Sequence, residues 1–271
     1  MIHLLACASV PVTPTPAAEV RLDVPYADEE LAELDLYLPA GGSDRLVVFV
    51  HGGSWVGGDK GNLEQAPGFV PWWQERGWAV AAPNFRLASG LGEEQEVTWR
   101  EQVADLEAAL GWLEDELRPD EVLLFGFSSG AHLVTLVDDE DIDGVISFDV
   151  HAYDVPLALE LMVGSDIEGN MPLIRWLFGE DEASQLEASS VTRVHEGSPP
   201  ALVVSADPDE PGTKGAIARE TSAAWAAHRD QLGLSTVHTH FDEQSHSALV
   251  MGFGAAGHGP TEAVEGFLAE L

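Results

Sequence analysis

The chain has 271 residues, 45% of them hydrophobic, and its 47 acidic and 12 basic residues give a formal net charge of −35. This length and apolar content suit one large α/β domain with a sizeable core. Nucleic acids and anionic surfaces are excluded as partners, because so acidic a surface repels phosphates. No apolar run reaches the roughly 18 residues that a membrane-spanning helix needs.

The acidic side chains greatly outnumber the lysines, which are Lys60 and Lys214 alone. Self-repulsion on this scale opposes compaction in dilute buffer, and salt screens it. Acid-rich, lysine-poor surfaces resemble those of proteins from high-salt habitats, so we expect a halophilic protein. The alternative is an ordinary acidic bacterial protein.

Residues 1–18 are expected to form a flexible N-terminal segment. Cys7 is the single cysteine, which excludes a disulfide within the chain. Residues 4–7 (LLAC) resemble the end of a bacterial lipoprotein signal, and residues 11–16 (PVTPTP) resemble a stiff tether. However, the apolar stretch before Cys7 is short and lacks a basic start. Two hypotheses stay open. One is a signal remnant with a lipid anchor at Cys7 on an exported or envelope-bound protein, and the other is a frayed terminus of a cytoplasmic one.

Residues 19–271 alternate between strand-like and helix-like segments and are expected to form a single domain. Residues 20–24 and 34–38 alternate apolar with polar side chains, which predicts two half-buried antiparallel edge strands. Short and almost wholly apolar runs then predict strands that helices cover on both faces. These runs are Leu46–Val50, Trp78–Ala82, Val122–Phe125, Val145–Phe148 and Ala201–Val204.

The clearest predicted helix spans Val97–Leu117, with its apolar side chains in one stripe, and ends before Pro119. Further helices are predicted at Lys214–Gln231 and Thr261–Leu271. Alternating strands and helices indicate an α/β fold with a mostly parallel central sheet flanked by helices. Residues 151–200 break this rhythm with glycines and prolines and are expected to be a small insertion that caps the site.

Residues 126–130 (GFSSG) follow the apolar strand Val122–Phe125 and precede a predicted helix that begins near Ala131. A nucleophile elbow needs this order of strand, cramped turn and helix, and its glycines leave room for the tight backbone. The turn exposes the Oγ of Ser128, and the helix N-terminus favours developing negative charge. We therefore predict that Ser128 is the catalytic nucleophile. The alternative is a glycine-softened turn without chemistry.

Residues 51–55 (HGGSW) directly follow the first of the apolar runs. Acyl transfer puts negative charge on the carbonyl oxygen, which fixed N–H donors stabilise. The main-chain amides of Gly53, Ser54 and Ser129 are the predicted oxyanion hole, and the alternative is a glycine-rich surface turn. We interpret His51 as a structural histidine that buttresses this loop.

Residues 51–60 (HGGSWVGGDK), 84–88 (NFRLA) and 126–133 (GFSSGAHL) together resemble a known family of α/β-hydrolases. They resemble the serine esterase branch related to hormone-sensitive lipase, and more closely the acetyl-xylan and feruloyl esterase-like (BD-FAE-like) enzymes and the kynurenine formamidases. Residues 34–39 (LDLYLP) match the entry strand of this group. The resemblance extends from about residue 20 to the C-terminus. It implies an α/β-hydrolase fold and a Ser–Asp–His triad in that chain order, with no metal and no cofactor.

The chain departs from the pattern of this family in three places. Ser54 replaces the third glycine of the usual HGGG motif, although it still offers an N–H group. Phe85 stands where the family has a tyrosine. Residues 201–208 (ALVVSADP) lack a residue or two before the expected acid.

The triad acid is expected among three carboxylates that follow the last apolar run, Asp207, Asp209 and Glu210. This acid accepts the histidine Nδ1–H and therefore lies at the carboxyl end of a strand. Asp207 occupies that place and matches the Asp-Pro pair of the family. We predict Asp207 as the acid, with Asp209 as its main rival.

His246 is the predicted base, because the resemblance puts the catalytic histidine on the last strand–helix loop, after the nucleophile and the acid. His258 is the reserve. His132 follows Ser128 by four residues on the same predicted helix, so its ring is expected to lie along the helix flank, out of reach of Oγ.

His238 and His240 lie within the predicted strand at residues 235–241 and are expected to be packed or solvated. Their spacing is compatible with a metal site, but no carboxylate or cysteine companion supports one. The sequence therefore predicts no metal.

These features predict a carboxylic ester hydrolase that acts on small or short-chain acyl esters through an acyl-enzyme on Ser128. Acetyl or feruloyl groups on plant polysaccharides are among the expected substrates, and no cofactor is expected. An arylformamidase or another amidase would share every catalytic residue. A catalytically inactive binding module with this fold is disfavoured, because candidates for serine, acid and histidine are all present. The oligomeric state stays open.

Overall fold

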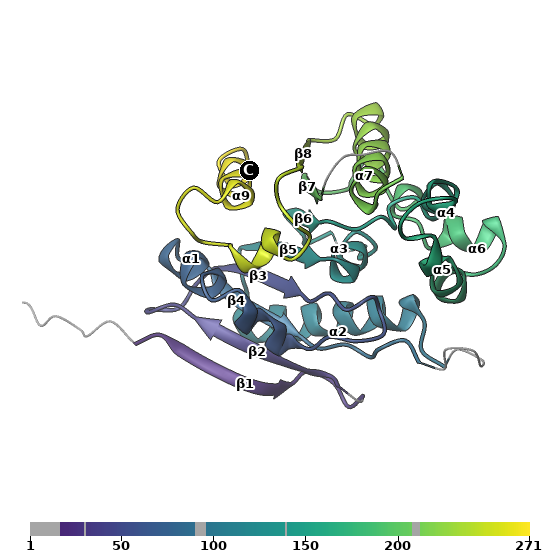
Figure 1. Ribbon diagram of the computed structural model, residues 1–271. Coiled ribbons are helices and arrows are strands. Elements are labelled where there is room, and N and C mark those ends of the chain that lie inside the picture. Colours follow the sequence, from purple (N-terminus) through teal and green to yellow (C-terminus); the bar gives the residue numbers. More distant parts are fainter. Residues whose placement is uncertain (1–16, 30, 90–95, 139, 208–211) are drawn as a thin grey trace, which may run out of the picture.

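The computed structural model describes residues 17–29, 31–89, 96–138, 140–207 and 212–271. Its strands are β1 (Glu19–Pro25), β2 (Glu33–Leu38), β3 (Arg45–Val50), β4 (Ala79–Pro83), β5 (Glu121–Phe127), β6 (Gly144–Phe148), β7 (Ala201–Ala206) and β8 (Thr236–Phe241). They form one sheet in the order β1-β2-β4-β3-β5-β6-β7-β8 (Figure 1). The pairs β1–β2 and β2–β4 are antiparallel, and every later pair is parallel. The predicted mostly parallel sheet is therefore confirmed.

The prediction that the first two strands are both edge strands is wrong for the second one. β2 lies between β1 and β4, and its Leu34 and Leu36 are fully buried. β1 is the edge strand, and Val20 and Leu22 on it are 56% and 59% exposed. Alternation reports that one face of a strand is buried, but it does not report how many strands lie beside it.

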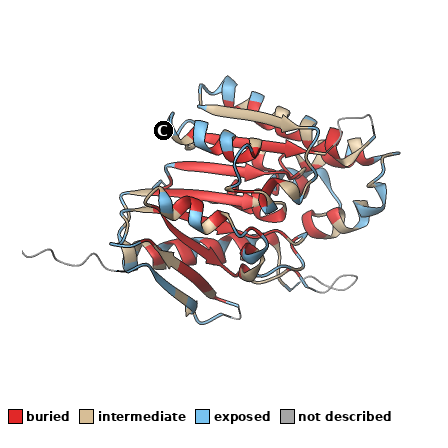
Figure 2. Cartoon of the chain, turned by 60° about the vertical axis from the view of Figure 1, so that its left-hand side comes forward, coloured by how far each residue is buried: buried red, intermediate tan, exposed pale blue. Residues whose placement is uncertain are grey.

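Helices cover both faces of the sheet (Figure 1). On one face lie α2 (Trp99–Leu117), α3 (Ser129–Val134) and α7 (Lys214–Gln231), which share an apolar core that includes Leu106 and Trp225. On the other face lie α1 (Phe69–Glu75), α8 (Ala248–Met251) and α9 (Gly259–Leu268), with a core that includes Phe69 and Phe267. The inner strands are consequently buried along their length (Figure 2), which explains their unbroken apolar runs.

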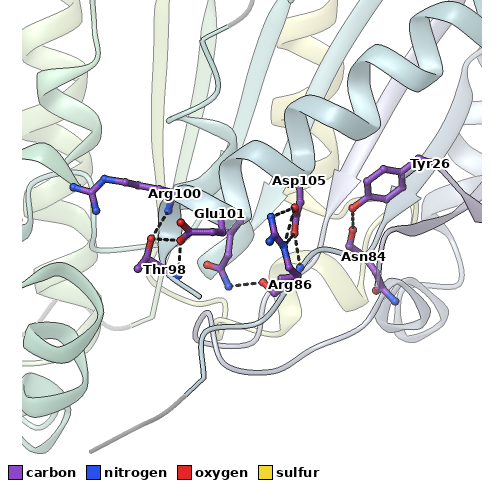
Figure 3. A network of polar contacts seen from close by, with 8 residues as sticks. Tyr26, Asn84, Arg86, Thr98, Arg100, Glu101 and Asp105 are labelled. Carbon is purple, nitrogen blue, oxygen red and sulfur yellow. Dashed lines mark hydrogen bonds and ion pairs between the residues drawn. The ribbon is translucent and has the colours of Figure 1, made fainter. Parts of the chain in front are cut away.

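The predicted helix at residues 97–117 corresponds to α2, which begins two residues later because Thr98 caps it. The Thr98 side chain accepts the Arg100 N–H at 3.1 Å, and the Glu101 carboxylate accepts the Thr98 N–H at 2.7 Å (Figure 3). This reciprocal capping box satisfies N–H groups that a helix start leaves without partners. The helix ends at Leu117, and Arg118 takes a left-handed conformation with a φ of 51°.

The segment between β6 and β7 contains α4 (Val155–Met162), α5 (Met171–Phe178) and α6 (Glu182–Glu187), with short 3₁₀ turns at Glu168–Asn170 and Ser190–Thr192. α4 lies beside α7, and α5 and α6 pack against α4 (Figure 1). A further 3₁₀ turn spans Lys60–Gln65. In the part of the chain that the structure describes, no helix is long and apolar enough to cross a membrane. The predicted N-terminal segment with Cys7 lies almost wholly outside the described residues.

Candidate active site

Ser128 lies in the turn between β5 and α3 with a φ of 55° and a ψ of −123°. This backbone conformation is disfavoured for a residue with a side chain and costs about 1–3 kcal/mol. Its N–H donates to the Phe148 carbonyl of β6 at 2.8 Å, which holds the turn against the neighbouring strand. Glycine is required at position 130, because a Cβ there would lie 2.1 Å from the Val50 carbonyl oxygen. The strand, turn and helix thus have the arrangement of a nucleophile elbow.

The loop after β3 lies directly against this turn. A Cβ on Gly52 would lie 2.7 Å from the Cβ of Ser128, so only glycine permits this approach. Gly53, Ser54 and Trp55 then have successive positive φ angles of 146°, 54° and 64°. The N–H groups of Gly53 and Ser54 donate no hydrogen bond to another described residue.

Trp55 fixes this loop through its main chain and its ring. Its carbonyl accepts hydrogen bonds from Gln102 Nε2 and from the Ala88 N–H, both at 2.8 Å. Its indole Nε1 donates to His132 Nδ1 at 3.1 Å, and His132 Nε2 in turn lies 2.8 Å from the Ala188 carbonyl. Burial lowers the pKa of His132 to about 4, so the ring stays neutral at pH 7. His132 therefore connects the loop to the segment between β6 and β7.

His246 lies on the loop between β8 and α8, and its ring contacts the elbow. The ring stacks on Phe127, the residue before Ser128, with 4.7 Å between ring centroids. Ser128 and His246 line the same cleft. His246 Nδ1 lies 2.5 Å from Asp149 Oδ2, at the end of β6. Asp149 as the partner of the His246 ring was not anticipated from the sequence, although the residue directly follows an apolar strand.

Asp149 and Asp207 both lie next to His246. The Asp149 side chain is fully buried, whereas that of Asp207 is 21% exposed and accepts the main-chain N–H of His246 at 3.0 Å. Burial, the largest single effect, opposes ionisation of Asp149. The hydrogen bond and charge of His246, the charge of Lys214 and the Ala206 N–H together lower the pKa of Asp149. Asp149 is consequently ionised at pH 7. The rival acids Asp209 and Glu210 lie outside the described residues.

The cleft has two halves that meet at Ser54, Ser128 and His246. One half has a volume of about 290 Å³ and is lined by residues that include Phe127, Val250 and Met251. The other has a volume of about 330 Å³ and is lined by residues that include Trp55, His151, Ile167, Leu173, Ile174 and Lys214. The segment between β6 and β7 supplies the apolar wall of this second half, which Ser128 also lines.

The model of the BD-FAE family matches residues 34–211, well over half of the chain. The chain belongs to the BD-FAE family. It is therefore a serine esterase of the α/β-hydrolase kind, as the motifs around Ser128 predict. No curated protein matches the chain by sequence.

Solved structures share the fold of this BD-FAE chain at low sequence identity. A truncated carbohydrate esterase from gut microbiota is 19% identical with a TM-score of 0.71, covering 95% of this chain and 99% of its own. Esterase B from Lactobacillus rhamnosis is 19% identical with a TM-score of 0.69, covering 94% and 87%. Butyrate-bound esterase 2 from Thermogutta terrifontis is 21% identical with a TM-score of 0.66, covering 94% of each chain. These likenesses establish the α/β-hydrolase fold.

The Asn84–Ala88 motif of the BD-FAE chain supports the loop at residues 51–55, which lies against the turn of Ser128. The His51 ring stacks on Phe85 with 4.4 Å between centroids, and burial lowers the pKa of His51. Asn84 accepts the Lys60 N–H at 2.6 Å, and its carbonyl accepts the Tyr26 hydroxyl at 2.6 Å (Figure 3). A phenylalanine at position 85 thus packs well where the family has tyrosine. These contacts agree with a structural role for His51.

Arg86 of the same motif attaches the segment at residues 84–88 to α2. Its guanidinium forms a forked pair with the buried Asp105, with Nη2 2.6 Å from Oδ1 and Nε 2.9 Å from Oδ2 (Figure 3). The Arg86 N–H also donates to Asp105 Oδ2 at 2.8 Å. Such bidentate pairs fix geometry as well as contributing energy. In this BD-FAE chain, the motifs at residues 51–55 and 84–88 are therefore held together with α2.

The other histidines considered in the sequence have partners away from the cleft. His258 is 9% exposed, and its ring nitrogens lie 2.8 Å from Thr261 Oγ1 and 3.1 Å from the Ala248 carbonyl. His238 and His240 pair with serine hydroxyls of α7 and β7, each at 2.9 Å. Among the described residues, no group of three or more His, Cys, Asp or Glu side chains could hold a metal ion.

Proposed function

We propose that the chain hydrolyses small and short-chain carboxylic esters through an acyl-enzyme on Ser128, with His246 as the general base. The observation that carries the proposal is that Ser128 and His246 line both halves of one cleft. The His246 ring is oriented there by a carboxylate at Nδ1, which leaves Nε2 as the atom that accepts the serine proton.

The chemistry proceeds in two halves. His246 Nε2 takes the proton of Ser128 as Oγ attacks the ester carbonyl carbon, and the electron pair of the C=O bond moves to its oxygen. The N–H groups of Gly53, Ser54 and Ser129 stabilise this oxyanion, each contributing about 3 kcal/mol. The protonated His246 then gives its proton to the departing alcohol. Water repeats the cycle on the acyl-enzyme and releases the acid.

Small substrate groups are supported by the size of each half of the cleft. The halves of about 290 and 330 Å³ are each only about as large as the smallest ligand pockets, whose range is roughly 300–1,000 Å³. Since the halves meet at Ser128, one holds the acyl group and the other the alcohol. Ligands of two proteins with the same fold suggest butyryl compounds as probes of this cleft. Esterase 2 of T. terrifontis binds butyrate, and esterase B of L. rhamnosis is inhibited by a tributyrin phosphonate.

The test compares wild type with Ser128→Ala on p-nitrophenyl esters of graded acyl length. Ser198, which lies outside the cleft, supplies the control variant Ser198→Ala. We expect Ser128→Ala to lose all serine-dependent turnover, about 10⁴-fold or more, while Ser198→Ala keeps wild-type rates. A fluorophosphonate probe should modify the wild type at Ser128 in intact-mass and peptide analysis.

Unchanged ester hydrolysis by Ser128→Ala would refute the assignment of the nucleophile. Absence of both turnover and fluorophosphonate labelling in the folded wild type would instead indicate a binding module. N-formylkynurenine in the same panel tests the ester assignment, because faster hydrolysis of the formamide than of every ester would make the enzyme an amidase on the same residues.

A further inference from the structure

Two carboxylates flank His246, and they contact different parts of it. Asp149 Oδ2 lies 2.5 Å from the ring atom Nδ1, whereas Asp207 Oδ1 lies 3.0 Å from the main-chain nitrogen. They follow the neighbouring parallel strands β6 and β7, whose carboxyl ends meet at one edge of the sheet. A partner at Nδ1 selects the tautomer of the ring and offsets the charge of the imidazolium. A partner at the main-chain N–H does neither.

Asp149 is held rigidly by the strand ends around it. Its Oδ1 accepts the Ala206 N–H at 3.0 Å, and its own N–H donates to the Val204 carbonyl at 2.7 Å. Its φ of 58° is left-handed, a conformation that aspartate tolerates better than most residues. The residue before it, Phe148, accepts the N–H of Ser128 at 2.8 Å. One strand end therefore orients both the nucleophile and the carboxylate at the base.

Asp207 forms hydrogen bonds to the main chain of the loop that carries His246. Its N–H donates to the Gln244 carbonyl at 2.9 Å, and Oδ1 accepts the His246 N–H. Its second oxygen, Oδ2, lies 3.5 Å from Lys214 Nζ. Both oxygens thus have partners other than the imidazole, and these contacts tie the loop to the end of β7.

The charges around the ring allow two carboxylates so close together. Lys214 Nζ faces both of them, 3.5 Å from Asp207 Oδ2 and 3.9 Å from Asp149 Oδ2. His151 also faces this cluster, and burial lowers its pKa to about 4, so it adds no charge at pH 7. The ammonium offsets one carboxylate, and the imidazolium formed during turnover offsets the other.

We infer that Asp149, and not Asp207, is the positioning carboxylate for the His246 ring, and that Asp207 positions the main chain of the loop. The inference rests on the proposed function, in which His246 carries the Ser128 proton. When that proton moves from Oγ to Nε2, the Nδ1–H stays on the ring and donates to Asp149. Asp149 remains ionised throughout, so no second proton transfer is needed.

The test compares Asp149→Asn with Asp207→Asn, measuring kcat and KM on p-nitrophenyl acetate. An asparagine at 149 presents either an amide donor or a weaker neutral acceptor to Nδ1, so we expect kcat to fall roughly 10³- to 10⁴-fold with little change in KM. An asparagine at 207 still offers an oxygen to the His246 N–H, so its kcat should stay within about tenfold of wild type. A kcat loss in Asp207→Asn equal to or larger than that in Asp149→Asn would overturn the inference.

A second measurement needs no activity and guards against variants that fold poorly. In protein with ¹⁵N-labelled histidine, the Nδ1 proton of His246 should give a far-downfield resonance because it donates to a carboxylate. We expect this resonance in wild type, in Ser128→Ala and in Asp207→Asn. Its loss in folded Asp207→Asn would contradict the assignment. If the resonance is lost in Asp149→Asn and kept in Asp207→Asn, but the wild type hydrolyses no ester, the inference stands and the proposed function alone is refuted.

Discussion

The buried ring of His132 makes the stability of this protein depend on pH between about 6.5 and 4. The ring is fully buried between Trp55 and the Ala188 carbonyl, and burial lowers its pKa to about 4. The same histidine in the unfolded chain has a pKa of about 6.5. Below about pH 6.5, His132 therefore binds a proton in the unfolded state but stays unprotonated in the folded state until the pH approaches 4. This contribution to stability is complete above pH 6.5 and is lost as the pH falls toward 4.

The size of the effect follows from the difference between the two pKa values. Between about pH 7.5 and pH 5, His132 alone should lower the free energy of unfolding by about 2 kcal/mol, rising to about 3 kcal/mol at pH 4. His151, with a pKa also lowered by burial to about 4, adds a slope of its own. Fewer ionised carboxylates at lower pH also weaken self-repulsion, which acts in the opposite direction. A variant without this histidine is therefore needed to isolate the contribution of His132 to the pH dependence of the free energy of unfolding.

The assay is urea unfolding of wild type and His132→Gln at about pH 7.5 and about pH 5. Glutamine reaches toward the same partners but does not titrate. It loses the ring contacts to Trp55 and Phe178, so the variant should be less stable at pH 7.5. Its loss of stability on going to pH 5 should be about 2 kcal/mol smaller than that of wild type. His228→Gln, at a partly exposed histidine of α7, is the control for the replacement of a histidine as such. Equal slopes in wild type and His132→Gln would refute the reasoning.

Three further predictions concern the loop beside the nucleophile, α2 and the surface charge. Gly52→Ala should lower kcat on p-nitrophenyl acetate by at least about 100-fold, because the added Cβ would lie 2.7 Å from that of Ser128; near-normal kcat would show that the approach is not tight. Gly111→Ala, at an exposed position in α2 where a Cβ meets nothing within 4 Å, should raise the free energy of unfolding by about 0.5–1 kcal/mol, and a decrease would contradict this. The melting temperature should rise between about 0.05 M and about 2 M KCl, since salt screens a formal charge of −35; a flat or falling curve would count against a halophilic protein.

Local chemistry made much of this protein predictable. The turn at residues 126–130 that carries Ser128 could be recognised because its strand, its glycines and its helix are adjacent in sequence. The apolar runs identified the parallel strands, since burial on both faces leaves no polar positions in them. His246 could be proposed as the base because the family resemblance puts the catalytic histidine on the last strand–helix loop, after the nucleophile and the acid.

Contacts between distant segments could not be inferred in the same way. Asp149 and Asp207 each follow an apolar strand, so both satisfy the rule that led to Asp207. Which of the two meets the ring depends on how the loop after β8 lies across two strand ends. Likewise, the position of β2 inside the sheet depends on the pairing of β1, which alternation does not encode.

The sequence alone determined the fold class and the strand, turn and helix that carry Ser128, because both follow from patterns of residues that lie close together in the chain. Only the tertiary structure decided which carboxylate contacts the imidazole, how His132 joins the loop at residues 51–55 to the segment between β6 and β7, and where the two halves of the cleft meet. Those features depend on distances of a few ångströms between residues many positions apart. Packing sets such distances, and no local pattern of side chains records them.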